Sequence, residues 1–199
     1  VKDSLGLGQA ILDTTYTALA DAITHATETL TKYIALETDG IDTAAVTAEI
    51  TQRKARMVEI AKAAQFEGQN LLRTGGTAVD IVSGYIKGGG GVQMLTLTPY
   101  NLEAAAAGIT SVATAQSTLD ALKTAAANFG AMKMRVESQT SFTSQQMDAI
   151  DRGIGQLIDA DMNAESARLS ALQVQQQLGI QALSIANSSS QNILTLFRG

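Results

Sequence analysis

Few residues of this chain are of types that carry out chemistry. His25 is the only histidine and there is no cysteine, so the chain offers neither a thiol nucleophile nor a second imidazole to share a metal ion. Its sequence neighbours, Thr24 and Ala26, give His25 no nucleophile pair of the kind that hydrolases use. We therefore interpret His25 as a solvated or packed residue of a helix.

Two other patterns invite a functional interpretation. Asp148, Asp151, Asp159 and Asp161 lie close in sequence but lack the glycine-containing ordered loop of an EF-hand, which favours a solvated acidic face over a metal site. Residues 88–91 are all glycine, without the strand–loop–helix context and following Lys-Ser/Thr of a phosphate-binding loop. We predict a flexible loop there, and no catalytic, cofactor or metal site; the protein is expected not to be an enzyme.

Composition points to long helices. Aromatic residues make up 4% of the 199 residues, tryptophan is absent and Pro99 is the only proline, while alanine is abundant. The net charge of −5 argues against nucleic-acid binding, and no cleavable secretory signal is present. Because the chain begins at Val1 inside a helical pattern, we expect an amino-terminal part of the natural protein to precede it.

Two helices are predicted in the first third of the chain, over residues 5–38 and 43–65. Apolar residues of the first form a stripe suited to packing along a partner helix, and Asp39-Gly40 ends it. On the second, we expect Glu49 and Arg53 to form an i,i+4 pair. The residues of the two apolar stripes are Leu12, Tyr16, Leu19, Ile23, Ala26, Leu30 and Tyr33, then Val46, Ile50, Met57, Ile60, Ala61 and Ala64.

The middle of the chain changes character. Two runs of β-forming residues flank the glycines and predict a β-hairpin at about 77–98. A third helix is predicted over residues 109–140 by a narrow coiled-coil seam at Ala115, Leu119, Leu122, Ala126, Phe129 and Val136. The stripe weakens through residues 138–141 and resumes at Met147, Ile150, Ile154 and Leu157. A final helix is predicted over 159–199, with Asp159, Asp161 and Glu165 near its start.

Residues 169–197 contain no Asp, Glu, Lys or Arg. The segment is a poor solvated surface, because it lacks the charges that keep an exposed helix in water. It is also a poor membrane span, since Gln175-Gln176-Gln177 and Ser188-Ser189-Ser190 interrupt it. We predict a helix that is covered by other protein. Its candidate contact residues are Leu169, Leu172, Val174, Leu178, Ile180, Leu183, Ile185, Ile193, Leu194, Leu196 and Phe197.

Residues 165–198, together with Ile-Asp-Ala-Asp at 158–161, are similar to the carboxyl end of bacterial flagellins, and the sequence resembles the short α-proteobacterial type of that family. Ala-Glu-Ile-Thr-Gln-Arg at 48–53, followed by Gln-Phe-Glu-Gly-Gln-Asn-Leu-Leu at 65–72, resembles the second amino-terminal helix and its turn into the hairpin. The two matches occur in the family's order and cover most of residues 43–72 and 119–199.

The resemblance implies a mainly α fold, with long antiparallel helices in a coiled-coil-like bundle and one small β-hairpin. Residues 1–153 would form the rod-like outer-tube domain of the filament, and residues 154–199 the carboxyl-terminal inner-tube helix. The implied function is that of a structural subunit, exported through the flagellar type III apparatus and polymerised into the extracellular filament for swimming motility. Its partners would be further flagellin subunits and an export chaperone at the carboxyl-terminal helix, with no nucleic acid and no membrane insertion.

The resemblance further implies that an amino-terminal segment pairs with residues 156–198, so this chain alone is expected not to form ordinary filaments. Family members are recognised by Toll-like receptor 5 through the first two outer-tube helices. Glu49 matches one position of that patch, while Glu28 and Lys32 fall near the positions where the family has Arg and Leu, which predicts weak activation. The alternatives are a hook–filament junction protein and a flagellin-like cell-surface protein that binds a ligand such as a polysaccharide.

Overall fold

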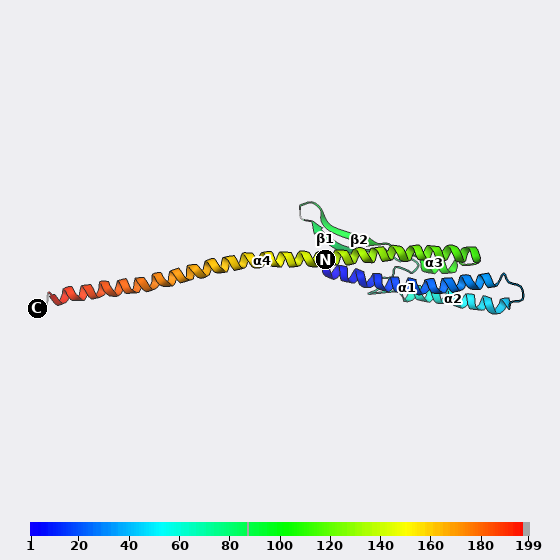
Figure 1. Ribbon diagram of the computed structural model, residues 1–199, viewed down its shortest axis with the longest axis horizontal. Coiled ribbons are helices and arrows are strands. Elements are labelled where there is room, and N and C mark those ends of the chain that lie inside the picture. Colours follow the sequence, from blue (N-terminus) through cyan, green and yellow to red (C-terminus); the bar gives the residue numbers. More distant parts are fainter. Residues whose placement is uncertain (87, 197–199) are drawn as a thin grey trace. The chain divides into compact units, whose positions relative to one another are not determined.

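The structure, a computed structural model, describes residues 1–86 and 88–196; for residue 160 and residues 189–196 it describes the backbone alone. The chain divides into two compact units, Val1–Ser144 and Gln145–Gly199. The elements follow the order α1 (Lys2–Ala35), α2 (Thr43–Ala63), β1 (Val79–Ile86), β2 (Gly91–Leu97), α3 (Leu102–Ala107) and α4 (Val112–Leu196) (Figure 1). The helical character and the single hairpin confirm the predicted fold class.

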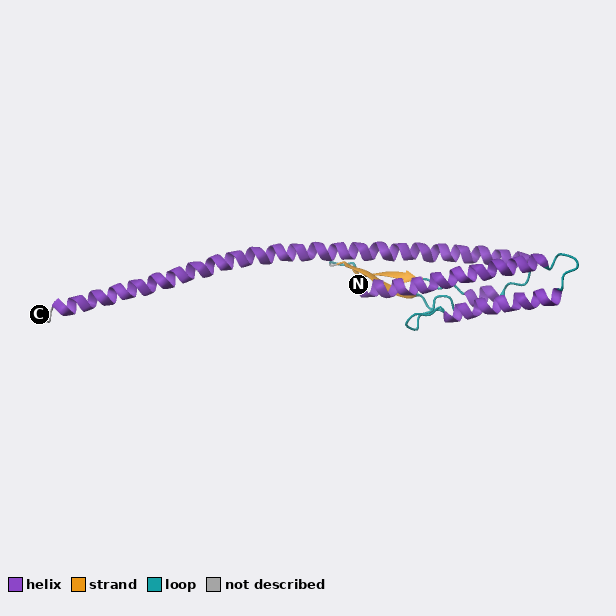
Figure 2. Ribbon diagram, turned by 60° about the horizontal axis from the view of Figure 1, so that its bottom comes forward, coloured by secondary structure: helices purple, strands orange, loops and turns teal. Residues whose placement is uncertain are grey.

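In the first unit, α1 packs against α2 and against the first part of α4, and the three helices run alongside one another (Figures 1 and 2). Their predicted stripes form the core, in which Leu12, Leu19 and Leu122 are completely buried. Tyr16 of the predicted stripe is 42% exposed, but its ring lies beside Gly130, where α1 and α4 approach closely. The periodicity therefore identified the buried faces correctly, apart from this aromatic ring.

Buried threonines complete the packed face of α1. Thr15 and Thr29 are 1% and 0% exposed, and each hydroxyl donates to the carbonyl oxygen four residues earlier in the helix, at 2.7 Å. Thr14, Thr24 and Thr27 make the same bond. Because its hydroxyl is satisfied within the helix, a threonine can be buried at this seam without an unpaired polar group.

Local polar contacts set the ends of the helices. Asp42 caps α2, since its carboxylate accepts hydrogen bonds from the amides of Ala44 and Ala45, each at 3.1 Å. Asn101 caps the short helix α3 by accepting from the amide of Ala104 at 2.9 Å. Helix α3, whose buried residues are Leu102 and Ala106, was not predicted from the sequence.

The segment between α2 and the hairpin is irregular but tied down. The amide side chain of Asn70 donates to the carbonyl oxygen of Ala61 at 2.8 Å and accepts from the amides of Leu72 and Arg73. Leu71 and Leu72 are both 0% exposed, and their carbonyl oxygens accept from the amides of residues 100 and 102. This loop therefore belongs to the core of the first unit.

The hairpin is antiparallel, with Ile81 opposite Leu95 and Val79 opposite Leu97, and its register shifts between Val82 and Gly84. Ile81, Leu95 and Leu97 face the core. Gly8 of α1 permits close approach of β1: a methyl group at that position would lie 2.0 Å from Cδ1 of Ile81. The amide of Val82 donates to Oγ of Ser4 at 2.9 Å.

The predicted third and final helices are one continuous helix, α4. The expectation of a separate helix starting at residue 159 was wrong, so Asp159, Asp161 and Glu165 lie within a helix and not at its start. No proline occurs within α4 to break it. The polar stretch near residue 140 also remains helical, and the hydroxyls of Thr140 and Thr143 are satisfied within it, donating to the carbonyl oxygens of Val136 and Gln139, each at 2.8 Å.

Candidate functional site

The second unit consists of the carboxyl-terminal part of α4, and its apolar side chains are exposed. Every described side chain predicted as a contact residue is more than half exposed, from 53% for Leu172 to 72% for Leu183. Ile193, Leu194 and Leu196 continue the helix, but their side chains lie outside the described residues, and Phe197 lies outside them altogether. The exposed members are Leu169, Leu172, Val174, Leu178, Ile180, Leu183 and Ile185.

These side chains occupy two sides of the helix. With about 3.6 residues per turn, Val174, Leu178 and Ile185 project to one side, and Leu172 and Leu183 project to roughly the opposite side. Leu169 and Ile180 flank the second group. Two sectors lie between these groups. One is polar and narrow, roughly a quarter of the circumference, and contains Ser170, Gln173, Gln177, Gln181, Ser184 and Ser188. The other contains mainly small residues: Ala171, Gln175, Gly179, Ala182 and Ala186.

Such a helix differs from the usual surface helix, which has a single apolar stripe facing the core of its own domain. Here most of the circumference is apolar or amide-bearing, and residues 169–197 have no charged side chain to keep it solvated. No helix among the described residues is long and apolar enough to span a membrane. The arrangement suits contact with other protein on more than one side.

The predicted receptor-contact residue, Glu49, lies on α2 and forms an ion pair with Lys32 of α1 at 2.5 Å. The hydrogen bond and the positive charge of Lys32 lower the pKa of Glu49. Arg53 pairs with Glu28 of α1, so both ion pairs connect the two helices. The charge of Arg53 also lowers the pKa of Glu49, in agreement with the predicted attraction within α2. The two ion pairs across the α1–α2 seam are additional, and sequence spacing alone could not reveal them.

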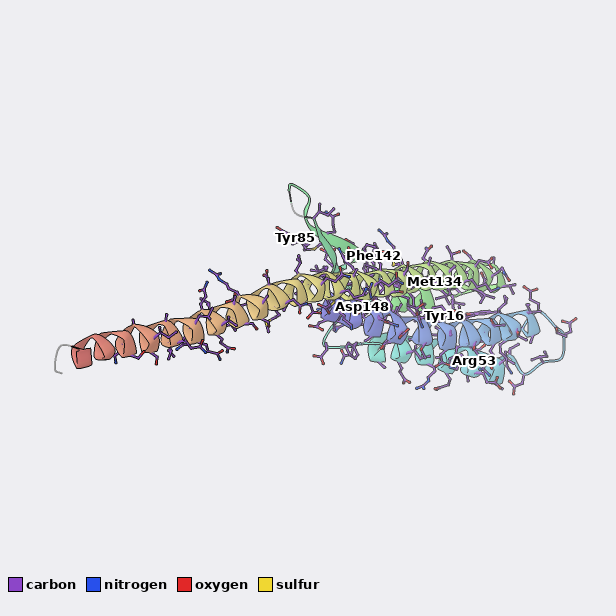
Figure 3. All side chains as sticks on the ribbon, turned by 60° about the vertical axis from the view of Figure 1, so that its left-hand side comes forward. Tyr16, Arg53, Tyr85, Met134, Phe142 and Asp148 are labelled. Atoms are coloured by element: carbon purple, nitrogen blue, oxygen red, sulfur yellow. The ribbon has the colours of Figure 1, made fainter. Side chains whose placement is uncertain are left out.

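A third connection fixes this end of the first unit. Nζ of Lys54 donates to the carbonyl oxygen of Ile109 at 2.6 Å, and the hydroxyl of Tyr33 donates to the same oxygen at 3.2 Å. Arg53, labelled in Figure 3, lies one residue earlier on α2. The carbonyl group of Ile109, just beyond α3, thus links α1 and α2, which holds in register the ion pairs between these two helices.

His25 lies near the same seam. Its Nε2 atom is 3.9 Å from Oδ1 of Asp21, and its Nδ1 atom is 3.6 Å from Oε2 of Glu28. The side chain is 23% exposed, which agrees with the interpretation of a partly packed helix residue. Among the residues that the structure describes, no three His, Asp or Glu side chains are grouped to hold a metal ion, the four aspartates of α4 included.

Comparison with known proteins identifies the family. Over its whole length the chain is 40% identical to a flagellin of Brucella melitensis, of which it covers 78%, and 35% identical to flagellin C of Rhizobium meliloti, of which it covers 80%. The chain belongs to the flagellin family. Residues 102–197 of this flagellin also match the model of the bacterial flagellin C-terminal helical region.

A solved structure supports the fold. The crystal structure of Bacillus cereus flagellin is similar with a TM-score of 0.60 at 16% identity, covering 71% of this chain and 88% of that one. At that identity the comparison concerns the fold alone. The family shows that this flagellin is a structural subunit of the bacterial flagellar filament, that it polymerises with further flagellin subunits, and that it is not an enzyme.

Proposed function

We propose that the carboxyl-terminal helix of this flagellin is its principal assembly surface. Residues 154–199 would form the inner-tube domain of the filament, and residues 1–153 the outer-tube domain. The observation that carries the proposal is the exposure of Leu172, Leu178, Leu183 and their neighbours on a helix segment without charge. Burying each leucine against another subunit would contribute about 1.5–3 kcal/mol.

The two apolar sides of the helix imply two different neighbours. A partner that packed only on the side of Val174 and Leu178 would leave Leu172 and Leu183 in water. In a helical lattice a subunit is surrounded on several sides, so both groups can be covered at once. The glutamine and serine side chains between them would then form hydrogen bonds with neighbouring subunits.

Before assembly the same surface would need protection. An exposed apolar helix promotes premature association, and a chaperone that binds both sides of it would prevent this. We propose that an export chaperone binds residues 169–197, and that the chain then passes through the flagellar type III apparatus to the outside of the cell. The support is the exposed surface and the family to which the chain belongs.

Because an amino-terminal segment is expected to pair with residues 156–198, the test introduces paired substitutions into the full-length flagellin gene that contains this sequence, expressed as the sole flagellin of a flagellin-null strain. Val174→Gln with Leu178→Gln changes one side, and Leu172→Gln with Leu183→Gln changes the other. Glutamine has nearly the helix propensity of leucine, so the helix itself is preserved. Gln177→Ala, in the polar sector, is the matched control.

If each apolar side of the helix contacts a different neighbouring subunit, either pair of substitutions should lower filament mass by at least about tenfold. Each apolar contact that is lost is worth more than about 1.4 kcal/mol, which corresponds to a factor of about ten in affinity. Electron microscopy measures the filaments, and the amount of flagellin in the medium measures export. Filaments of normal length with either pair would refute the two-sided surface. Chaperone binding is measured separately with purified proteins, and an unaltered affinity for both variants would refute the chaperone site.

We also propose that Glu49 belongs to a weak receptor-contact surface. It lies beside Lys32 and Glu28, where the family pattern has Leu and Arg, and all three side chains are engaged in ion pairs between α1 and α2. A cell reporter for Toll-like receptor 5 is expected to respond far less to this flagellin than to one with the family pattern. A response of equal potency would contradict the proposal.

A further inference from the structure

The sulfur of this chain is confined to six methionines, because it has no cysteine. A thioether sulfur is a nucleophile at every pH, and two-electron oxidants such as hydrogen peroxide convert it to the sulfoxide. Solvent access decides which methionine of a folded protein reacts. The methionines of this chain are therefore candidates for modification in proportion to their exposure.

Their exposure differs widely. Met57, on α2, is 0% exposed within the core, whereas Met134, on α4, is 71% exposed. Met94, on the hairpin, and Met147 and Met162, farther along α4, have intermediate values of 57%, 48% and 62%. Met134 is thus the most accessible of the methionines in the described part of the chain.

Met132, on the same turn of α4, provides an internal comparison for Met134. Met132 is half-buried and packs against the core of the first unit, only two residues away. Between them, Nζ of Lys133 pairs with Oδ1 of Asp13 on α1 at 2.6 Å, so this turn of α4 has one side held against α1. Met134, labelled in Figure 3, follows on the same turn with its side chain exposed. The two thioethers therefore share a helix and differ in accessibility.

We propose that Met134 is an oxidative modification site, which reacts with peroxide-class oxidants before Met132 and Met57. The sulfur lone pair attacks one peroxide oxygen and the O–O bond breaks. An S–O bond forms, and the second oxygen leaves as water after taking up the proton of the first. The sulfur is oxidised by two electrons and the peroxide is reduced by two, so no further reactant is required.

Modification at Met134 is compatible with the native fold. Its side chain makes no contribution to the buried cluster, so a polar sulfoxide there remains in water. The same oxygen on Met57 would enter an apolar core and demand a hydrogen-bond partner that the core does not supply. Methionine sulfoxide reductases can return the sulfoxide to the thioether, which makes the site reversible.

The experiment exposes the folded, full chain to dilute hydrogen peroxide and follows sulfoxide formation by tandem mass spectrometry of a peptide that contains both Met132 and Met134. We expect an initial rate at Met134 about tenfold higher than at Met132, and Met57 unmodified while the circular dichroism spectrum is native. In concentrated urea the three rates should converge. The Met134→Leu variant serves as the control, because it should leave the slow rate at Met132 unchanged.

Equal rates at Met132 and Met134 in the folded chain would overturn the proposal. A loss of helical circular dichroism in step with Met134 oxidation would overturn it as well, because the site would then contribute to the fold. Since the readout is the sulfoxide and not the polymer, the outcome is independent of the proposed assembly surface.

Discussion

Replacing Gly8 by alanine tests the close contact between α1 and β1. The added methyl group would lie 2.0 Å from Cδ1, 2.9 Å from Cγ1 and 3.3 Å from Cγ2 of Ile81, which is 2% exposed. Gly6 offers a matched control on the same helix, because a methyl group there would meet nothing within 4 Å. The two substitutions are chemically identical and differ in what surrounds them.

The magnitudes follow from two opposing effects. Alanine in place of glycine favours a helix by about 1 kcal/mol, so Gly6→Ala should raise the free energy of unfolding by up to that amount. At Gly8 the same gain is opposed by overpacking against Ile81, which costs about 1–3 kcal/mol. Gly8→Ala should therefore be destabilised relative to Gly6→Ala by about 1–3 kcal/mol.

Urea unfolding of the full chain, followed by circular dichroism, measures the difference for the transition of the first unit. Hydrogen exchange at the amide of Val82 provides a local readout, because that amide donates to Ser4 beside the contact. Ile81→Val removes Cδ1, the atom nearest the new methyl group. The double variant Gly8→Ala/Ile81→Val should recover most of the difference, which gives a double-mutant cycle with a coupling energy of about 1 kcal/mol or more.

The reasoning would be refuted if Gly8→Ala stabilised the protein as much as Gly6→Ala. It would also be refuted if Ile81→Val lowered stability equally in the unaltered chain and in the Gly8→Ala variant, because the predicted clash would then be absent. Either result would mean that β1 does not approach α1 as closely as the structure shows.

Three further predictions concern the first unit and its contrast with the second. Because Lys32 lowers the pKa of Glu49, the ion pair between them should stabilise the fold at neutral pH. This stabilisation should be lost as the pH falls through the lowered folded-state pKa, below about 4.5. Glu49→Gln should therefore flatten the stability–pH curve in that acidic range. Leu12→Ala, in the core, should lower the free energy of unfolding by about 2–5 kcal/mol, whereas Leu157→Ala, at a side chain 73% exposed, should change it by less than about 0.5 kcal/mol in urea titrations. Asn70→Ala should lower the free energy of unfolding by about 1–3 kcal/mol, because backbone groups of the loop would be left unpaired. The loop that follows residue 64 should then be cleaved rapidly by a protease, and an uncleaved loop would contradict the role of Asn70 in holding it.

Periodicity was sufficient to predict the helices and the faces they bury. Leu119, Leu122 and Phe129 recur at helical spacing and all pack in the core, and two β-forming runs around four glycines give a hairpin. These features are local, since a stripe or a turn is encoded within one segment. The same locality explains the error in α4, because the apolar stripe weakens at residue 140 and suggests a boundary, although no residue there breaks a helix.

Long-range contacts were beyond the reach of the sequence. Glu49 and Arg53 have the spacing of an intrahelical pair, but each also forms an ion pair with an opposite charge on α1 once the helices pack. Similarly, Asn70 has no periodic pattern around it, and only the fold shows that its amide joins α2 to the following loop. Polar residues that connect different helices, strands or loops can therefore be identified only from the tertiary structure.

The segment that carries the candidate site could be singled out from the sequence, because its signal is compositional, and its coverage by other protein stays a prediction. An absence of charge over residues 169–197 is visible without any structure. The structure adds the side on which each residue lies, and with it the distinction between the group of Leu178 and the group of Leu172 and Leu183.

The threonines of α1 have a consequence for a protein that must be surrounded by copies of itself. At Thr14, Thr24 and Thr27 the hydroxyl is already bonded to a carbonyl oxygen of the helix, which leaves the methyl group as the part that a neighbour meets. A neighbouring subunit that covered these positions would leave no hydroxyl donor unpaired, so it would not need an acceptor at an exact place opposite each threonine. A contact of this kind would tolerate small shifts in register between adjacent subunits.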